Sequence, residues 1–123
     1  MSSTNSLQTI LLKSDVFEVS TANAFRKLRE DTLFTDVTLV SNDNKSIKAH
    51  KVILCSASPY LRTILESKAS VGNPVLSLNI EHVHLESIVE YIYMGQVRVG
   101  LLDMNQFLEI RLTGVIPEVQ TVV

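Results

Sequence analysis

The chain has 123 residues, of which 46% are hydrophobic and 20% are charged, with a formal net charge of −2. This length is that of one small domain. A charge so close to zero excludes the clustered Lys and Arg of a nucleic-acid-binding face, and the single cysteine, Cys55, excludes an internal disulfide. Without a signal peptide or an apolar run of about 20 residues, the sequence predicts an intracellular, soluble protein.

The mean hydropathy of the chain is +0.21, which is high for so small a domain. One small core has difficulty hiding that much apolar surface. The composition therefore favours a self-associating protein over a monomer.

The N-terminus begins with a Ser/Thr/Asn leader that has nothing to bury, and we expect it to be disordered. A short apolar run follows it. This run fits a frayed strand, a helix stub, or a strand that pairs with the sheet edge of a second copy, and the residues alone do not separate these interpretations. Its apolar members are Leu7, Ile10, Leu11 and Leu12.

A helix is predicted from a cap at Ser20 or Thr21 to about Asp31. Apolar residues share one face of it, while mainly charged residues cover the other. The apolar stripe is thin for a helix that packs only within its own chain, but an ordinary core helix would bury the same residues. The stripe, extended by two residues upstream, comprises Phe17, Val19, Ala22, Phe25 and Leu28.

The middle of the chain predicts a β-hairpin followed by two helices. Apolar and polar residues alternate on both sides of an Asn/Asp turn between residues 36 and 49. From Lys51 the pattern becomes helical, and Ser58-Pro59 starts a second helix because proline fits the first helical position.

The last third of the chain predicts two short strands and two helices. A strand over residues 75–78 follows the turn at Asn73-Pro74, and residues 96–100 can form another. Between them, residues 81–95 have an unbroken helical period that ends at Gly95. Asp103 caps a further helix, whose pattern is interrupted soon after Ile110.

The hairpin and the helices after it resemble the BTB/POZ family, whose motif here runs F-x-D-V-x-L, a turn, I-x-A-H-K-x-V-L-x-x-x-S-P-Y-F, and later Y-x-Y-x-G. Within this family the chain looks most like the Tramtrack-type domains of arthropod transcription and chromatin factors. The matching residues are Phe34, Asp36, Val37, Leu39, Ile47, Ala49, His50, Lys51, Ile53, Leu54, Ser58, Pro59, Tyr60, Tyr91, Tyr93 and Gly95.

The resemblance implies an α+β fold, in which a small mixed sheet is flanked by a cluster of helices and the N-terminal helix forms a dimer. It divides the chain into a flexible leader (1–13) with an exchanged strand, a BTB/POZ domain (14–112) and an atypical C-terminal tail (113–123). For the apolar run Leu7 to Leu12 it favours strand exchange. The implied dimer interface contains Phe17, Phe25, Leu28 and Phe34.

The function implied by the resemblance is self-association of a nuclear transcription or chromatin regulator, as a homodimer or a hexamer. Other BTB domains or corepressors are further expected partners, while this domain itself is expected to contact neither nucleic acid nor membrane. The alternative is a substrate adaptor for a cullin-type ubiquitin ligase. Its hydrophobic-x-Glu element is matched by Ile64-Leu65-Glu66, but this match falls too early in the chain.

Asp36 and Lys51 form the most informative charged pair. An acidic residue at the start of a buried strand is costly unless it is paired or hydrogen-bonded. The resemblance implies that the two residues form a charged pocket at the dimer interface. The alternative is that Asp36 accepts backbone hydrogen bonds while Lys51 is solvated.

The sequence offers no convincing catalytic or metal site, and we expect neither an enzyme nor a cofactor. His82 and His84 are two apart, so on a helix they would not share a face, and no further ligand stands at a suitable spacing. His50 belongs to the Ala-His-Lys motif, where a packed, hydrogen-bonded role is favoured. The four glycines are too scattered for a phosphate-binding loop.

Overall fold

The sheet of the computed structural model, which describes residues 8–112, has three strands in the order β2-β1-β3. β1 (Val37–Val40) and β2 (Ser46–Ala49) form the expected antiparallel hairpin, with Leu39 opposite Ile47. β3 (Val75–Ser77) lies parallel to β1, with Leu76 opposite Leu39. The sheet is therefore mixed, and the predicted α+β class is confirmed.

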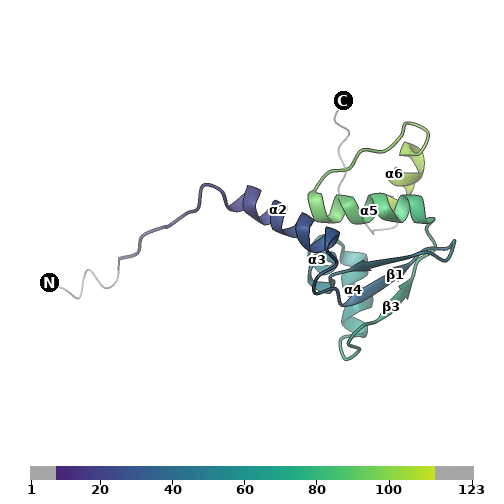
Figure 1. Cartoon of the computed structure of the whole chain (residues 1–123), viewed down its shortest axis with the longest axis horizontal. Helices are drawn as coiled ribbons and strands as arrows, with labels where there is room; N and C mark the ends of the chain where they lie inside the picture. Colours follow the sequence, from purple (N-terminus) through teal and green to yellow (C-terminus); the bar gives the residue numbers. More distant parts are fainter. Residues whose placement is uncertain (1–7, 113–123) are drawn as a thin grey trace.

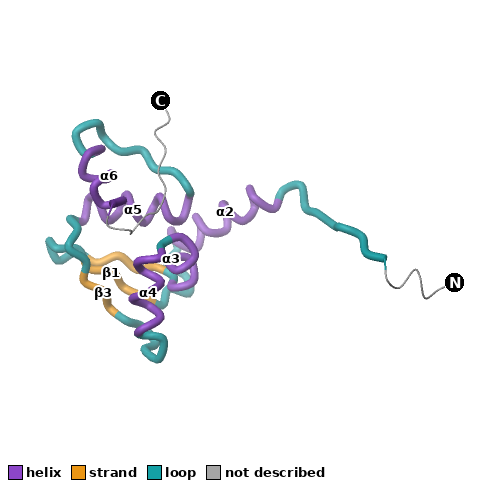
Figure 2. Tube along the Cα trace, turned by 180° about the vertical axis from the view of Figure 1, so that it is seen from behind, coloured by secondary structure: helices purple, strands orange, loops and turns teal. Residues whose placement is uncertain are grey.

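Five helices accompany the sheet in the described part of the chain. α3 (Lys51–Ala57) and α4 (Pro59–Ser67) lie together against the sheet, α5 (His82–Met94) runs across its upper side in Figure 1, and α6 (Met104–Leu112) lies beyond α5. α2 (Phe17–Glu30) projects from the side opposite to α6, and the chain before it runs away from the body (Figures 1 and 2).

The core lies where the sheet, α3, α4 and α5 meet. Its most deeply buried members are leucines and valines whose side chains alternate inward along β1 or recur at helical spacing along α4 and α5. A second, smaller cluster joins α5 to α6 through Ile88 and Phe107. The largest fully buried apolar side chains are Leu39, Leu54, Leu61, Leu85, Ile88, Val37 and Val89.

Several predicted helix ends are confirmed. Pro59 occupies the first turn of α4, where the Ser58 hydroxyl accepts the backbone N–H of Leu61 at 3.2 Å. α5 ends at Gly95, whose φ of 75° is the left-handed conformation that favours glycine.

Two helices take a capping carboxylate from a distant part of the chain. The N-cap residues of α3 and α5, His50 and Glu81, make no side-chain capping bond. Instead Asp36 accepts the backbone N–H of Lys51 at 2.7 Å, and Asp43 accepts that of His82 at 2.9 Å. Both carboxylates lie just outside β1, so the hairpin fixes where these two helices begin.

Two sequence predictions are wrong. α2 begins at Phe17 rather than after Ser20 or Thr21, and its N-cap residue Val16 makes no side-chain cap. Residues 96–100 do not form a strand, because no described strand lies beside them and Val97 and Val99 pack against the α5–α6 cluster instead.

Other predictions fall partly outside the described residues. Leu7 and the tail from residue 113 are outside them. Within residues 8–14 the chain is neither helix nor strand. The proposed boundaries of the leader and the tail therefore stay predictions.

Candidate functional site

α2 is the least covered helix of the described chain. None of its 14 residues is buried, although its sequence is amphipathic. Phe25 and Leu28, near its C-terminal end, are half-buried, and Phe25 packs on the main core. Towards the N-terminus Phe17 is 65% exposed, and Val16 and Val19 are exposed as well. One end of α2 thus holds the helix to the body, and the other end presents apolar side chains to solvent.

The segment before α2 continues this apolar surface. Ile10, Leu11 and Leu12 are all more than 80% exposed, and they lie in extended chain that leads into α2. The Ser14 hydroxyl accepts the backbone N–H of Val16 at 3.3 Å, where the extended chain turns into the helix. We call residues 8–16 the N-terminal arm.

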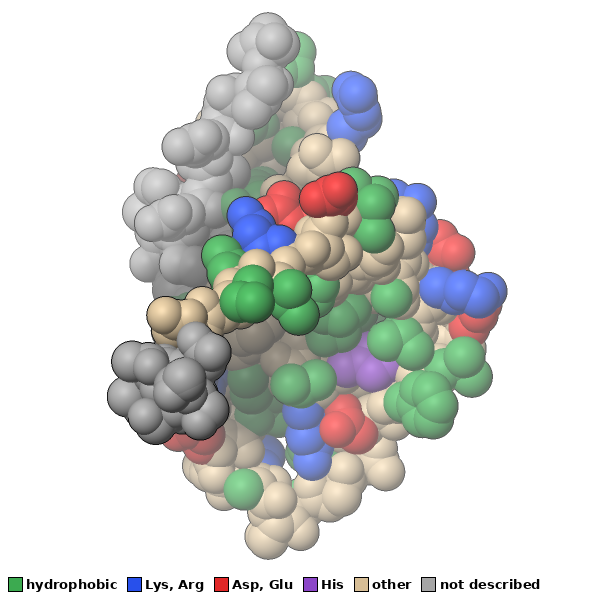
Figure 3. Space-filling view, turned by 90° about the vertical axis from the view of Figure 1, so that its left-hand side faces the viewer, with side chains coloured by type: hydrophobic (Ala, Val, Ile, Leu, Met, Phe, Trp, Pro, Cys, Tyr) green, Lys and Arg blue, Asp and Glu red, His purple; other side chains and the backbone are tan. Residues whose placement is uncertain are grey.

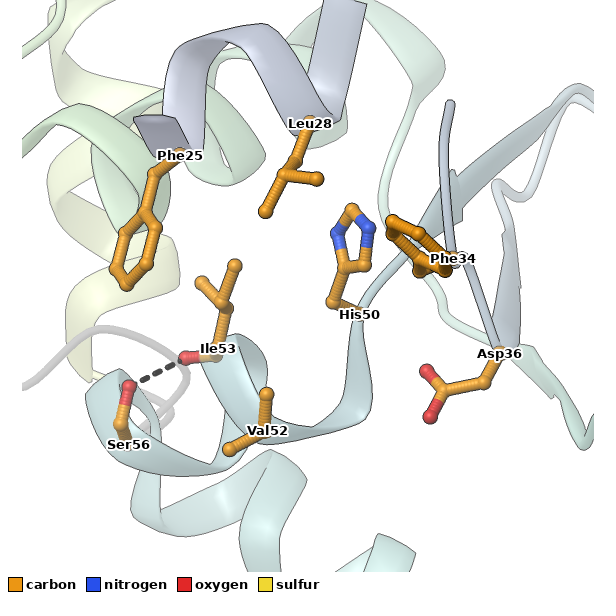
Figure 4. Close-up of a pocket in the computed structure, with 8 residues that line it drawn as sticks. All are labelled: Phe25, Leu28, Phe34, Asp36, His50, Val52, Ile53 and Ser56. Atoms are coloured by element: carbon orange, nitrogen blue, oxygen red, sulfur yellow. Dashed lines mark hydrogen bonds between the residues drawn. The ribbon is translucent and has the colours of Figure 1, made fainter. Parts of the chain in front are cut away.

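A hollow of about 390 Å³ opens beneath the C-terminal half of α2. α2, the turn after it and α3 form its walls, and most of its surface is apolar (Figure 4). In Figure 3, which looks along the projecting arm, hydrophobic side chains gather around a histidine on this face, beside one basic and one acidic side chain. The hollow is lined by Phe25, Leu28, Phe34, Asp36, His50, Val52, Ile53 and Ser56.

His50 holds the turn between α2 and β1 against α5. The Tyr93 hydroxyl accepts the backbone N–H of His50 at 2.9 Å and lies 2.6 Å from the Nδ1 atom of the same residue. Because a carbonyl oxygen can only accept, Nε2 carries the proton that it donates to the Leu33 carbonyl, and in this tautomer Nδ1 accepts from the Tyr93 hydroxyl. Burial, opposed by the His50 N–H, raises the pKa of Tyr93 to about 12, so the hydroxyl stays protonated at neutral pH.

The turn held by His50 presents Phe34 to solvent. Phe34 has a φ of 61°, a left-handed conformation that is rare for an aromatic residue. Its side chain is 82% exposed and stands at the rim of the hollow (Figure 4). Strained backbone of this kind persists where surrounding contacts fix it, and here the His50 ring bonds the carbonyl of the preceding residue.

Asp36 and Lys51 lie side by side but do not form an ion pair in the described structure. The Oδ1 atom of Asp36 accepts the backbone N–H of Lys51, whereas the Lys51 ammonium donates to the Val71 carbonyl at 2.7 Å. Asp36 also lines the hollow, so its carboxylate lies at the predicted interface. The charged pocket expected from the sequence remains a prediction.

The remaining histidines and the single cysteine are placed as parts of the fold. His82 and His84 lie in the first turn of α5. His84 is buried, and the Nε2 atom of His82 lies 3.6 Å from the Oε1 atom of Glu86. Burial raises the pKa of the Cys55 thiol, which makes it a poorer nucleophile. Between residues 8 and 112 no group of three or more His, Cys, Asp or Glu residues is arranged to hold a metal ion. Nor does any helix in that range have the length and hydropathy to cross a membrane.

The structure brings most of the predicted interface residues together. Phe25, Leu28, Phe34 and Asp36 line one hollow, while Phe17 lies at the other end of α2. Sequence reasoning missed Val52, which is 75% exposed within the apolar block after Lys51. An exposed valine beside two buried residues, Ile53 and Leu54, would have been found by assigning the faces of α3.

Comparison with known proteins gives a consistent result for sequence and structure. A family model described as the BTB/POZ domain matches residues 25–119. The chain is 34% identical over 102 residues to the Longitudinals lacking protein-like protein of Drosophila melanogaster, covering 83% of this chain and 80% of that protein. It is 36% identical to the Broad-complex core protein of the same organism, again over 83% of this chain but only 14% of the relative.

Solved structures give the same fold. The BTB domain of human gigaxonin superposes with a TM-score of 0.72 at 26% identity, covering 89% of both chains. The BTB domain of zebrafish PATZ1 also has a TM-score of 0.72, at 16% identity over 88% of each chain, a likeness that concerns the fold alone.

Proposed function

Because this chain belongs to the BTB/POZ family of protein-interaction domains, we propose that it acts by associating with a second copy of itself. In the proposed role it is the oligomerisation domain of a transcription or chromatin regulator in the nucleus. Relatives named Transcription activator GAGA and Protein tramtrack, both from Drosophila melanogaster, support this assignment.

The single observation that carries the proposal is the uncovered state of α2. A helix of 14 residues with no buried member gains little from packing within its own chain. Phe17 and Val19 on α2, and Phe34 in the turn after it, add large exposed apolar side chains. Contiguous apolar surface of this kind marks a protein–protein contact, and a second copy is the partner that would bury it on both sides.

The chemistry of the site favours binding over catalysis. Interfaces are enriched in aromatic residues that bury about 150–250 Å² each. The hollow offers two such residues, Phe25 and Phe34, and the N-terminal end of α2 offers a third, Phe17. Ser56, His50 and Asp36 do line the hollow, but they are not arranged as a catalytic group. The Ser56 hydroxyl donates to the Ile53 carbonyl, and both ring nitrogens of His50 are engaged, by the Tyr93 hydroxyl and the Leu33 carbonyl. Association would raise the effective concentration of whatever regions the two chains carry, without new contacts by those regions.

Assembly beyond a dimer is part of the proposal, through the N-terminal arm. In it, Leu7, Ile10, Leu11 and Leu12 would pair with the sheet edge of a neighbouring copy, and Asp36 and Lys51 would remain in the interface as the charged pocket. Exposed β-prone chain next to an open sheet edge is the usual requirement for such exchange. Other BTB domains or corepressors are further proposed partners.

Light scattering tests self-association directly. We expect the purified chain to have at least twice the 13.7 kDa mass of one copy, and Phe17→Glu to reduce it to one copy. Leu102→Glu is the matched control, because Leu102 is 96% exposed in the loop before α6. Deletion of residues 1–13 should then convert a larger assembly into a dimer. A wild-type mass of one copy at micromolar concentration would refute the proposal.

The adaptor function is the second candidate, and a relative named Kelch-like protein 23 from Homo sapiens keeps it in consideration. The local structure of its candidate element counts against it. Leu65 is buried in the core, and Glu66 bonds Arg62 at 2.7 Å, so Ile64-Leu65-Glu66 is engaged within α4. A pull-down with a cullin separates the two candidates, since nanomolar binding would favour the adaptor.

A further inference from the structure

The carboxylate of Asp36 forms no ion pair within residues 8–112. Its Oδ1 atom accepts one backbone N–H, but the neighbouring Lys51 ammonium is engaged by the Val71 carbonyl. Asp36 is nevertheless half-buried and lines the hollow (Figure 4). A charge in this position gains from a cation supplied by whatever occupies the hollow.

The rest of the hollow requires an apolar occupant. Five of its eight lining residues are apolar, namely Phe25, Leu28, Phe34, Val52 and Ile53. Its volume of about 390 Å³ leaves room for an aromatic side chain. The matching ligand therefore combines an aromatic ring with a cation a few residues away.

The N-terminal arm and the start of α2 supply an aromatic ring and a cation at this spacing. Phe17 is 65% exposed at the start of α2, and Lys13 precedes it by four residues in the N-terminal arm. Lys13 is exposed and makes no ion pair with the described residues. Both side chains therefore remain available to a second molecule.

A symmetric pairing of two copies would bring the N-terminal end of α2 in one copy to the hollow of the other. If two α2 helices cross antiparallel at their midpoints, between Asn23 and Ala24, Phe17 of one copy lies level with Glu30 of the other. Glu30 is within one helical turn of Leu28, which lines the hollow. The same operation places the second Phe17 at the first hollow, as an isologous interface requires.

We infer that Phe17 of a second copy fills the apolar part of the hollow while Lys13 of that copy binds the Asp36 carboxylate. The inference rests on the proposed self-association and adds to it the identity of the inserted residues. It makes the interface reciprocal, with two aromatic plugs and two ion pairs. It also gives Asp36 two roles, one oxygen capping α3 within its own chain and the other facing the second copy.

The dimer dissociation constant, measured by sedimentation equilibrium, tests both contacts. Phe17→Ala should raise it by about 30-fold or more, the effect typical of a buried aromatic anchor, whereas Leu102→Ala should leave it unchanged. Lys13→Glu should raise it about tenfold or more, and Lys13→Arg should preserve it. Lys48→Glu, an identical charge change on exposed β2, is the control for overall charge.

A double-mutant cycle makes the ion-pair test specific. Asp36→Asn keeps an oxygen for the Lys51 N–H but removes the charge, so in this background Lys13→Glu should lose most of its effect. If wild type is a dimer but Lys13→Glu and Phe17→Ala change its dissociation constant less than about twofold, or the cycle is additive, the inference is wrong while self-association stands. If wild type is a monomer, the proposed function itself fails.

Discussion

At the scale of single residues, the bond from His50 to the Leu33 carbonyl connects the core to the exposed face. Tyr93 on α5 accepts the His50 backbone N–H and contacts Nδ1, while Nε2 donates to the Leu33 carbonyl, so α5 helps to hold the turn that presents Phe34. Sequence reasoning favoured a packed, hydrogen-bonded role for His50. It had no means of finding the partner, which is 43 residues further along the chain.

Replacing Tyr93 by Phe tests this connection. The change leaves the His50 N–H and Nδ1 without a partner in a buried site, because Tyr93 is only 3% exposed. We expect the free energy of unfolding, measured with urea, to fall by roughly 1–3 kcal/mol. Tyr60→Phe, at an exposed position, is the control, and an equally small loss for both variants would contradict the assignment.

The sequence identified Asp36 and Lys51 as a pair, but it did not predict the contact that they make. The motif pointed to Asp36 and Lys51 as a pair, and they do touch, but through the carboxylate and a backbone N–H. Whether an ammonium reaches a particular oxygen depends on side-chain torsions that a motif does not encode. The structure shows that the Lys51 ammonium binds the loop before β3 through the Val71 carbonyl.

Asp36→Ala should lower the free energy of unfolding by roughly 1.5–3 kcal/mol, the usual contribution of a hydrogen bond to a charged group. Asp36→Asn should lose less, since its amide oxygen still accepts the Lys51 N–H. Urea unfolding at a fixed protein concentration compares the two. Equal losses would mean that the charge, and not the acceptor at the start of α3, is what stabilises the fold.

At the scale of elements, the hairpin acts as a template for two helices. Asp36 and Asp43, at either end of β1, accept the first backbone N–H of α3 and of α5. The Ser41 hydroxyl foremost, and then the His82 backbone N–H, lower the pKa of Asp43 below its ordinary value, although burial opposes them. A lowered pKa in the folded state means that the ionised carboxylate stabilises the fold.

The lowered pKa of Asp43 predicts how the stability of the fold changes with pH. Its stabilisation is present above the unfolded pKa of about 3.9 and is lost as the pH falls through the lower folded value. We expect Asp43→Asn to have a lower Tm than wild type at pH 7, with a gap that closes as the pH falls from about 4 towards about 2. Asp15→Asn, on the exposed arm, is the control. A gap that is constant with pH would argue that the carboxylate's charge has no part in capping α5.

The elements that were predictable are those whose signal is local. The hairpin, the start of α4 at Pro59 and the end of α5 at Gly95 follow from turn residues, a proline at a permitted position and a glycine in a left-handed conformation. The start of α2 was missed because Val16 offers no side-chain cap. The strand expected at 96–100 failed because strands need a neighbour, and tertiary packing placed Val97 and Val99 on a helix cluster.

At the scale of the whole molecule, the domain leaves apolar side chains uncovered on one side. The sheet, α3, α4 and α5 form a closed core, but α2 and the arm leave their apolar side chains outside it. Composition already suggested an excess of apolar surface, and the structure shows that much of it gathers on one projecting side. The position of Phe25, Leu28 and Phe34 around one hollow came only from the fold, since α2, the turn and α3 are separated in sequence.

Hydrogen exchange along α2 tests most directly whether a second copy covers this helix. The amides of Phe17–Glu30 should become more protected as the protein concentration rises from nanomolar to high micromolar, in step with the mass seen by light scattering. The amides of α5, inside the core, should stay protected throughout and serve as the internal reference. Exchange along α2 that is equally fast at every concentration would contradict the account.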